Sequence, residues 1–489
     1  MATKSKAAFG YVTKAGYLNQ KVEPPKYADY VIAELRYDKP IAYEASAFKA
    51  PAAAKKEADN LNQVLSHFDI ANMGSLFGLG AAKVSKRVEL AASLPSLPSG
   101  STVEKRGGDP AFFQSNFVCI VPKCPSDAKR LAAALGKSEA VWGAYVAPRP
   151  VPAAATTGPA SGSRNFEPSQ GYLHSAPNGI GAMQVWDLAG AKGKGVTICD
   201  IEGAWNREHE DLPAGISLIG GDMLNDLGWR DHGTAVLGEM VARPNTFGAV
   251  GAAHEAKAVV HSAFFNQVFN LAGALSNAAS KLKAGDVILI ELQSTGPNGK
   301  YVAMQYWNDI FTAIKTAVSK GITVVEAAGN GDENFDLAIF KDTGLQKDSG
   351  AIVVGAGVPP TNYFDNANGY ATIGAPRSRI WFSNYGNIVN VQAWGWHVTT
   401  LGYGDAQGGS EKSWYTLRFS GTSSASPIVT AAAACLQGRA KAKNGTPLTP
   451  AKLREILIKT GTPQEPGPGV PLSQKIGPQP NLASAMAKV

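Results

Sequence analysis

The stretch FSGTSSASPIVTAAAAC, residues 419–435, joins a dense group of small hydroxyl residues to an alanine-rich apolar run. The run predicts a buried helix, and Pro427 is tolerated in the first turn of such a helix. Gly421 allows close backbone approach just before the hydroxyl group of Ser423. Backbone N–H groups without partners gather at a helix start and favour negative charge there. The stretch therefore predicts a nucleophilic serine at the start of a buried helix.

Short apolar runs and helical segments alternate on the N-terminal side of this stretch. The runs are residues 196–201, 259–263, 287–292, 322–327 and 352–354. They are continuously apolar, which is typical of parallel strands covered on both faces. Helical periodicity spans 268–282 and 307–319, and a last helix runs from Pro450 to Gly461 after the capping residue Thr449. Residues 171–489 are thus predicted to form an α/β domain, with a parallel sheet flanked by helices.

Three further polar residues stand where ligands of open parallel sheets bind, beyond the carboxyl ends of strands. Asp200 ends the strand GVTICDI, and Asn330 ends GITVVEAAGNG. His232 opens the helical stretch DHGTAVLGEMVA. Histidine can take the proton of a serine, a buried carboxylate orients the imidazole, and an amide stabilises the developing oxyanion. With Ser423, these residues are the parts of a nucleophilic hydrolase.

Together, the motifs resemble those of the subtilisin-like (subtilase) serine endopeptidases, in which the triad follows the chain order Asp, His, Ser. The matching stretches are Glu210-Asp211-Leu212, His232-Gly233-Thr234, Ala328-Gly329-Asn330, Phe382-Ser383-Asn384-Tyr385-Gly386 and Gly421-Thr422-Ser423-Ser424-Ala425-Ser426-Pro427. The resemblance covers residues 170–489. It implies peptide-bond hydrolysis through an acyl-enzyme, with Asp200, His232 and Ser423 as the triad. Asn330 and the Ser423 N–H would form the oxyanion hole.

The chain departs from the family pattern around two acidic positions. Asp200 is followed by Ile201-Glu202-Gly203, where the family usually has Thr or Ser and then Gly. Glu291-Leu292-Gln293-Ser294 stands where many members have Ser-Leu-Gly-Gly. The resemblance implies that this stretch pairs with the substrate backbone.

Small residues near the oxyanion position leave room for a substrate side chain. Ala327, Ala328 and Gly329 follow Glu326, and the neighbouring strand carries Glu291. A carboxylate aimed into a closed pocket would favour Arg or Lys before the scissile bond. The alternative is that one or both glutamates point at solvent or at a buried partner.

The first 150 residues have a different organisation. Their predicted order is strand, helix, strand, strand, helix, strand, which is the ferredoxin-like arrangement. The segments are residues 30–37, 52–68, 84–90, 117–121, 126–135 and 140–146. The pattern is similar to subtilase propeptides, so 1–150 is predicted to be an intramolecular inhibitor; the alternative is a permanent accessory domain. Residues 151–170, rich in Pro, Ala, Gly and Ser, are the expected linker.

Composition and charge exclude several other classes. The net charge is +7, and residues 1–150 carry 20 Lys+Arg against 13 Asp+Glu, so the remainder is neutral. Basic residues do not form dense clusters, so nucleic acid is not an expected partner. No run of about 18 apolar residues predicts a membrane span. The first residues lack the apolar core of a secretory signal, which favours a cytoplasmic location, or a secreted one if a leader was removed.

No cofactor is required for the predicted chemistry. His254-Glu255 is followed by Ala258 where a zinc helix needs histidine. Calcium is a common structural ion in the family, but no acidic loop marks a site for it. The expected partner is a peptide or protein substrate. The alternative function is a non-catalytic peptide-binding or regulatory protein on the same scaffold.

Overall fold

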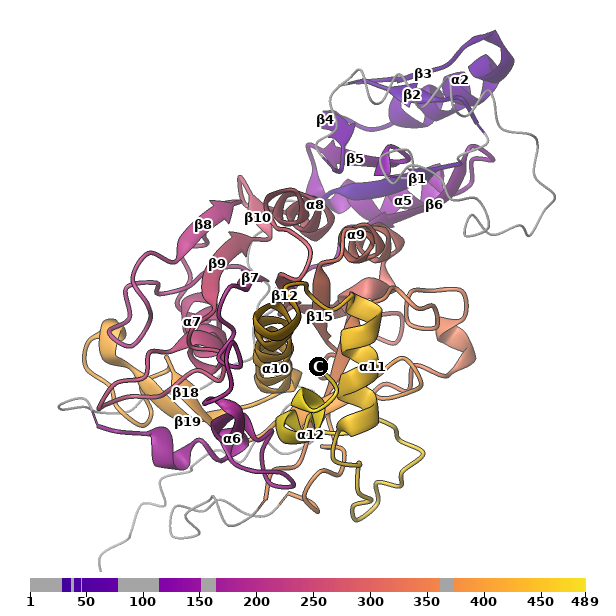
Figure 1. Cartoon of the computed structure of the whole chain (residues 1–489). Helices are drawn as coiled ribbons and strands as arrows, with labels where there is room; N and C mark the ends of the chain where they lie inside the picture. The colour runs from indigo at the N-terminus through magenta and orange to yellow at the C-terminus, as the bar shows by residue number, and fades with distance from the viewer. Residues whose placement is uncertain (1–28, 37–38, 45, 78–113, 151–163, 361–372) are drawn as a thin grey trace, which may run out of the picture.

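A computed structural model describes residues 29–36, 39–44, 46–77, 114–150, 164–360 and 373–489. A small N-terminal unit lies against one side of a larger α/β unit (Figure 1). No helix in the described ranges is long and apolar enough to cross a membrane.

The larger unit is built on a seven-stranded parallel sheet in the order β17-β16-β15-β12-β7-β9-β8. Its strands are β7 (Thr197–Glu202), β8 (Ser217–Gly220), β9 (Lys257–Ser262), β12 (Val287–Ile290), β15 (Thr323–Ala327), β16 (Ile352–Gly357) and β17 (Val391–Trp394). The five predicted strands and the parallel α/β class are confirmed. β8 and β17 are additional, and both lie at the edges of the sheet.

Helices cover both faces of this sheet, which explains why its inner strands are buried and mostly apolar. The flanking helices are α7 (Leu227–Val241), α8 (Leu271–Lys281), α9 (Asn308–Ser319), α10 (Thr422–Asn444) and α11 (Pro450–Thr460). α7 and α10 pack together on one side, and α8 and α9 pack together on the other (Figure 1). α10 is buried on every face through most of its length. The predicted cap of α11 is confirmed, because the Thr449 side chain accepts the backbone N–H of Lys452.

The N-terminal unit is an antiparallel sheet in the order β4-β5-β1-β6. Its elements are β1 (Val31–Leu35), α2 (Lys55–Leu65), β4 (Ile70–Ser75), β5 (Phe117–Pro122), α5 (Ala128–Leu135) and β6 (Val141–Val146). The order and pairing are those of the predicted ferredoxin-like arrangement. The predicted strand at 84–90 lies outside the described residues, and β4 provides the second strand of the sheet.

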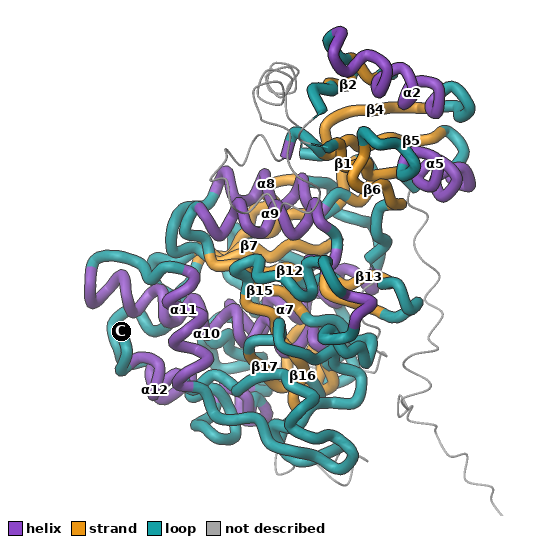
Figure 2. The backbone as a smooth tube through the Cα atoms, turned by 90° about the vertical axis from the view of Figure 1, so that its right-hand side faces the viewer, coloured by secondary structure: helices purple, strands orange, loops and turns teal. Residues whose placement is uncertain are grey.

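Alternation along β1 shows how the two units meet. Val31, Ala33 and Leu35 point into the small core beneath α2 and α5. Tyr30 and Ile32 point the other way and belong to the same apolar cluster as α8 and α9. Figure 2 shows the two helices sandwiched between the small sheet and β7 and β12. β1, at the centre of the small sheet, is therefore buried on both faces.

Polar contacts reinforce this junction. The Tyr145 hydroxyl donates to Asp309 Oδ1 at 2.5 Å, and the Asn308 amide donates to both Glu34 carboxyl oxygens at 3.0 Å. The Asn270 side chain donates to the Leu76 carbonyl at 2.7 Å. These contacts join β1, β4 and β6 of the small unit to the starts of α8 and α9.

The structure describes only the last residues of the predicted linker, residues 164–170, and these pair with the larger unit. Asn165 forms a β-bridge with Gly248, and the buried Gln170 side chain bonds the backbone of Val250 at 2.7 and 2.9 Å. Residues 164–170 therefore belong to the larger unit, because their backbone is paired with it. Most of the predicted linker, residues 151–163, lies outside the described residues.

Candidate active site

The candidate residues meet at the carboxyl ends of the central strands. His232 lies in the second turn of α7, and Ser423 lies in the first turn of α10. Asn330 follows β15. The helices α7 and α10 pack together above β7, β12 and β15, which brings residues far apart in the sequence to one place (Figure 1).

The carboxylate that contacts His232 is Glu202. Glu202 Oε2 lies 2.7 Å from His232 Nδ1, and both side chains are buried. Asp200, the expected partner, instead accepts a hydrogen bond from Trp205 Nε1 at 2.7 Å. Both acids project from the same face of β7, because side chains two residues apart in a strand share a face. The expected Asp200–His232 pair is therefore corrected to Glu202–His232, at the end of the same strand.

Burial controls the protonation of this pair. Removal from water raises the pKa of Glu202, and it raises the pKa of Asp200 with help from the nearby Glu202 charge. Burial lowers the pKa of His232 to about 4, against the attraction of Asp200. His232 is accordingly neutral at pH 7, as a base must be. When Glu202 is ionised, it accepts the Nδ1 hydrogen and leaves the lone pair on Nε2 free.

Gly421 stands two residues before Ser423, at the start of α10. Its φ of 108° lies in a region that favours glycine, and it directly precedes the first residue of α10. Ser423 is 7% exposed, so a small opening reaches it. The Phe419 ring meets the His232 ring edge to face, with centroids 5.4 Å apart. These neighbours hold both candidate residues in a largely dry site.

The side-chain amide of Asn330 has a hydrogen-bonded oxygen, Oδ1, and an unpaired nitrogen, Nδ2. Its Oδ1 accepts the Thr422 N–H at 2.8 Å and the Thr422 hydroxyl at 3.0 Å. Its backbone N–H donates to Gln293 Oε1 at 2.8 Å. The Nδ2 group is buried and has no hydrogen-bond partner in the described part of the chain. Since buried donors are normally paired, this group is poised for a ligand oxygen.

The residues expected to bind substrate lie at the ends of β12 and β15, and one of them contacts Asn330. Leu292, Ala327 and Ala328 are buried. The Gln293 side chain accepts the backbone N–H of Asn330. Gly329 has a φ of 92° and donates its N–H to the Thr422 hydroxyl at 3.1 Å. β13 (Gln293–Thr295) forms a hairpin with β14 (Tyr301–Ala303).

The outer edge of β13 is occupied by the chain itself. Pro150 forms an antiparallel bridge with Ser294, and the Ser294 hydroxyl donates to the Arg149 carbonyl at 2.8 Å. The segment that leaves β6 of the small unit thus reaches the expected substrate-binding stretch.

The two glutamates proposed for specificity have buried partners. Glu326 Oε1 accepts the backbone N–H of Gln305 at 2.7 Å, and burial raises its pKa to about 8. Glu291 Oε2 accepts the Ser426 hydroxyl at 2.5 Å. Both are 2% exposed or less, so the structure favours the alternative of buried partners over a carboxylate facing an open pocket.

Reasoning from sequence missed Glu202 as the histidine partner, together with the supporting roles of Trp205 and Thr422. Alternation put Asp200 and Glu202 on one face but could not choose between them. The available signal was the acid–glycine step Glu202-Gly203, where the strand ends.

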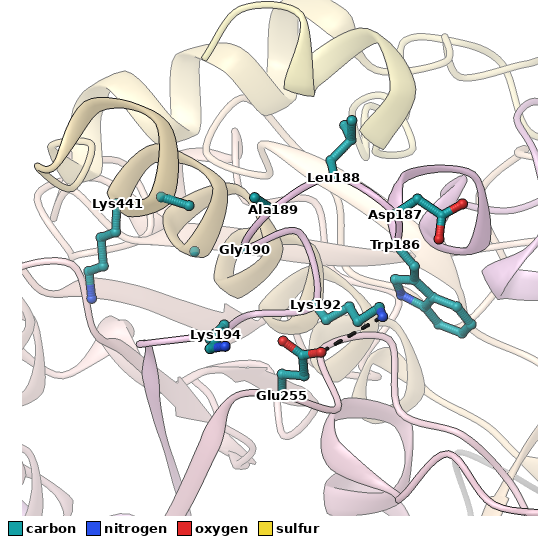
Figure 3. A pocket seen from close by; sticks show the side chains of 11 residues that line it. Trp186, Asp187, Leu188, Ala189, Gly190, Lys192, Lys194, Glu255 and Lys441 are labelled. Carbon is teal, nitrogen blue, oxygen red and sulfur yellow. Dashed lines mark ion pairs between the residues drawn. The ribbon is translucent and has the colours of Figure 1, made fainter.

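Two cavities lie outside the Ser423–His232 centre. One of about 580 Å³ is lined by Trp186, Lys192, Glu255 and Lys441 among others, with a Lys192–Glu255 ion pair at 3.7 Å (Figure 3). The other, of about 640 Å³, includes Trp205 and Arg230. Neither is lined by Ser423 or His232. The described residues contain no group of three or more His, Cys, Asp or Glu side chains arranged to hold a metal ion.

Comparison with known proteins identifies the family. The model of the Subtilase family (Peptidase_S8) matches residues 193–477, more than half of the chain. An intracellular serine protease of Paenibacillus polymyxa is 27% identical over 306 residues, which are 60% of this chain and 82% of that protein.

The solved structures of two proteases are similar to this chain. Fervidolysin from Fervidobacterium pennivorans, described as a keratinolytic enzyme related to subtilisin, matches with a TM-score of 0.52 and 14% identity, over 96% of this chain and 62% of its own. A protease from Pseudoalteromonas arctica PAMC 21717 matches with a TM-score of 0.48 and 23% identity, over 67% and 99%. With the family match, the parallel sheet and the motifs in hand, the chain belongs to the subtilase family of serine endopeptidases.

Proposed function

We propose that Ser423 is the nucleophile, His232 its general base, and Glu202 the carboxylate that orients His232. Ser423 Oγ bonds to the carbonyl carbon of the scissile peptide while its proton passes to His232 Nε2. The leaving amine takes this proton as the C–N bond breaks, which leaves an acyl-enzyme. Water then attacks the acyl group with the same proton transfers, releases the acid and restores Ser423.

The observation that carries this proposal is the unpaired Asn330 amide beside the start of α10. Thr422 fixes Oδ1, so Nδ2 stays directed away from that contact as a donor. An oxyanion accepts hydrogen bonds from such a donor and from the Ser423 N–H. Donors that are already oriented in a dry site lower the barrier without reorganisation.

A fluorophosphonate probe tests the nucleophile directly. Wild type should be labelled on Ser423, and Ser423→Ala should lose both the label and peptidase activity, by about 10⁶ in kcat. Ser420→Ala is the matched control, because Ser420 bonds the backbone of Arg418 and His397 and lies outside the triad. Labelling of Ser423→Ala, or turnover close to wild type in that variant, would refute the assignment.

The N-terminal unit is proposed to be an intramolecular inhibitor. Its sheet packs on α8 and α9, and its exit segment, Arg149–Pro150, pairs with Ser294 at the expected substrate edge. Arg149 is itself fixed by an ion pair to Asp29 at the start of the small sheet. A chain in this position occupies the edge that a substrate strand would need.

Intact-mass analysis tests whether this unit is removed. The wild-type chain is expected to be cut between residues 147 and 170, whereas Ser423→Ala remains whole under the same conditions. A wild-type chain that is both intact and fully active would instead establish residues 1–150 as a permanent accessory domain.

The proposed substrate is a peptide or protein, and the proposed chemistry requires no cofactor. A cytoplasmic location is also part of the proposal, since a relative carries the name of an intracellular serine protease.

A further inference from the structure

Four buried carboxyl groups interact near the candidate site, and one of them, Glu202, is the proposed triad acid. Asp200 and Glu202 come from β7, Glu239 from α7, and Glu291 from the end of β12. Each is at most 2% exposed. Electrostatic repulsion couples Glu291 to Asp200 and Glu202, and couples Glu239 to Glu291. Such a cluster cannot be fully ionised in a dry interior, so some of its members carry protons.

Glu291 is the member that interacts with the proposed nucleophile. The Ser426 hydroxyl, one turn along α10 from Ser423, contacts its Oε2 at 2.5 Å. The nearby Ser423 hydroxyl favours the ionised form of the same carboxyl and so acts to lower its pKa. Its Oε1 is buried and has no hydrogen-bond partner in the described chain. This side chain therefore lies beside the proposed nucleophile, although the proposed triad gives it no role.

The contacts of Ser426 indicate where a proton sits. The Ser426 hydroxyl lies 2.5 Å from Glu291 Oε2 and 2.7 Å from the Thr422 carbonyl, and both of those oxygens accept when Glu291 is ionised. A hydroxyl has one hydrogen and cannot donate fully to two acceptors. A protonated Glu291 resolves this, because it donates to Ser426 while Ser426 donates to Thr422.

The surrounding charges act in the same direction. From β7, Asp200 and Glu202 face Glu291, and from α7, Glu239 faces it. α10 presents only hydroxyl groups, and Glu326 on β15 is turned to Gln305. Burial and these carboxyl neighbours raise the pKa of Glu291, and among the described groups no lysine or arginine offsets the rise.

We propose that Glu291 is a further catalytic residue, which must carry its proton for Ser423 to react. A neutral carboxyl competes weakly for the Ser423 hydrogen and leaves it to His232. An ionised carboxylate is a stronger acceptor and draws that hydrogen away from the base. It also places negative charge beside the developing oxyanion, which raises the barrier. The inference rests on the proposed roles of Ser423 and His232.

The test is the pH profile of kcat/KM for Glu291→Gln, whose amide can donate to Ser426 but cannot ionise. Wild-type activity is expected to fall at alkaline pH, by about tenfold per pH unit once Glu291 ionises. In Glu291→Gln, the ratio of kcat/KM at about pH 9.5 to that at about pH 6 is expected to rise at least tenfold. Glu326→Gln is the matched control, a buried carboxyl on the adjacent strand that keeps the wild-type profile.

A second measurement covers the case in which Glu291→Gln folds poorly. The infrared spectrum of wild type at neutral pH should contain the C=O stretch of a protonated carboxyl, which disappears over the same pH range as activity. An alkaline fall that persists in Glu291→Gln, or a wild type without such a fall, would overturn the inference. Failure of Ser423→Ala to lose activity would instead overturn the proposed function, so the two failures are distinguishable.

Discussion

Asp200 and Glu202 are chemically similar acids on one face of β7, yet their partners differ. The Trp205 indole donates a hydrogen bond to Asp200, and the His232 ring bonds to Glu202. The extra methylene of glutamate and the position of Glu202 at the very end of the strand place its carboxyl against the imidazole. The acid that contacts His232 is thus determined by its place on the strand.

Substitution of the two acids separates their roles. Glu202→Gln should lower kcat by about 10⁴, because an amide no longer favours the histidine tautomer with a free Nε2. Asp200→Asn keeps an oxygen that can accept the hydrogen bond of Trp205, so kcat is expected to fall by no more than about tenfold. Steady-state kinetics of both variants give the answer. A larger loss in Asp200→Asn would return the orienting role to Asp200.

The acid limb of the activity profile should report the His232–Glu202 pair. Burial lowers the pKa of His232 to about 4, so protonation of the imidazole should reduce activity only below that pH, instead of near the usual value of 6.5. Burial raises the pKa of Glu202, which must be ionised to accept the Nδ1 hydrogen, so a fall in activity above pH 4 should come from Glu202. kcat/KM of wild type and Glu202→Gln, measured from about pH 3 to 7, separates the two groups. A limb centred near 7 that persists in Glu202→Gln would contradict the lowered pKa of His232.

The central strands were predictable because their signal is local. The five interior runs are mostly apolar and buried, whereas β8, at an edge, has the partly exposed sequence Ser217–Gly220. Ser423 and Asn330 could be proposed from the sequence because each lies at the start or just after the end of an element with a distinctive sequence. The choice of Glu202 over Asp200 depends on where α7 places His232 relative to β7, and the acid–glycine step Glu202-Gly203 was its one local signal in this strand.

Gly421 at the start of α10 is expected to be essential for the geometry of the site. An added Cβ would stand 3.1 Å from Asn330 Nδ2, and the residue already has a φ of 108°. Gly421→Ala should destabilise the fold by about 1–2 kcal/mol through backbone strain and also lower kcat. Gly445→Ala, at the other end of α10, has a φ of 72° and open space around it. This control should show a comparable fall in melting temperature with unchanged kcat; equal kcat in both variants would contradict the argument.

The junction of the two units contains its own pair of acids. Burial and the nearby Asp309 raise the pKa of Glu34 to about 7, although Asn308 and Lys347 oppose the shift. Burial also raises the pKa of Asp309 to about 6, against the hydrogen bond from Tyr145. Docking of the small unit therefore favours the protonated forms of both acids.

Docking should accordingly weaken as pH rises. Each acid binds its proton more tightly in the docked state, so the docking constant falls by up to about tenfold per pH unit for each acid between its free and docked pKa. Hydrogen exchange of β6 and α9 in the Ser423→Ala chain, corrected for intrinsic rates, should show less protection at about pH 8 than at about pH 5. A chain that also carries Glu34→Gln and Asp309→Asn should lose this difference. Equal protection in the parent chain would disprove the dependence.

The apolar cluster shared by Tyr30, Ile32, α8 and α9 has a consequence for the colloidal behaviour of any shortened form. Detachment of the small unit would expose the outward apolar sides of α8 and α9 to water. Exposed apolar patches of this kind promote self-association and adsorption. The shortened protein should therefore self-associate more readily than the full chain and bind a hydrophobic dye more strongly. Its shelf life in solution would then depend on dilution, salt and surfaces more than on the strength of its central sheet.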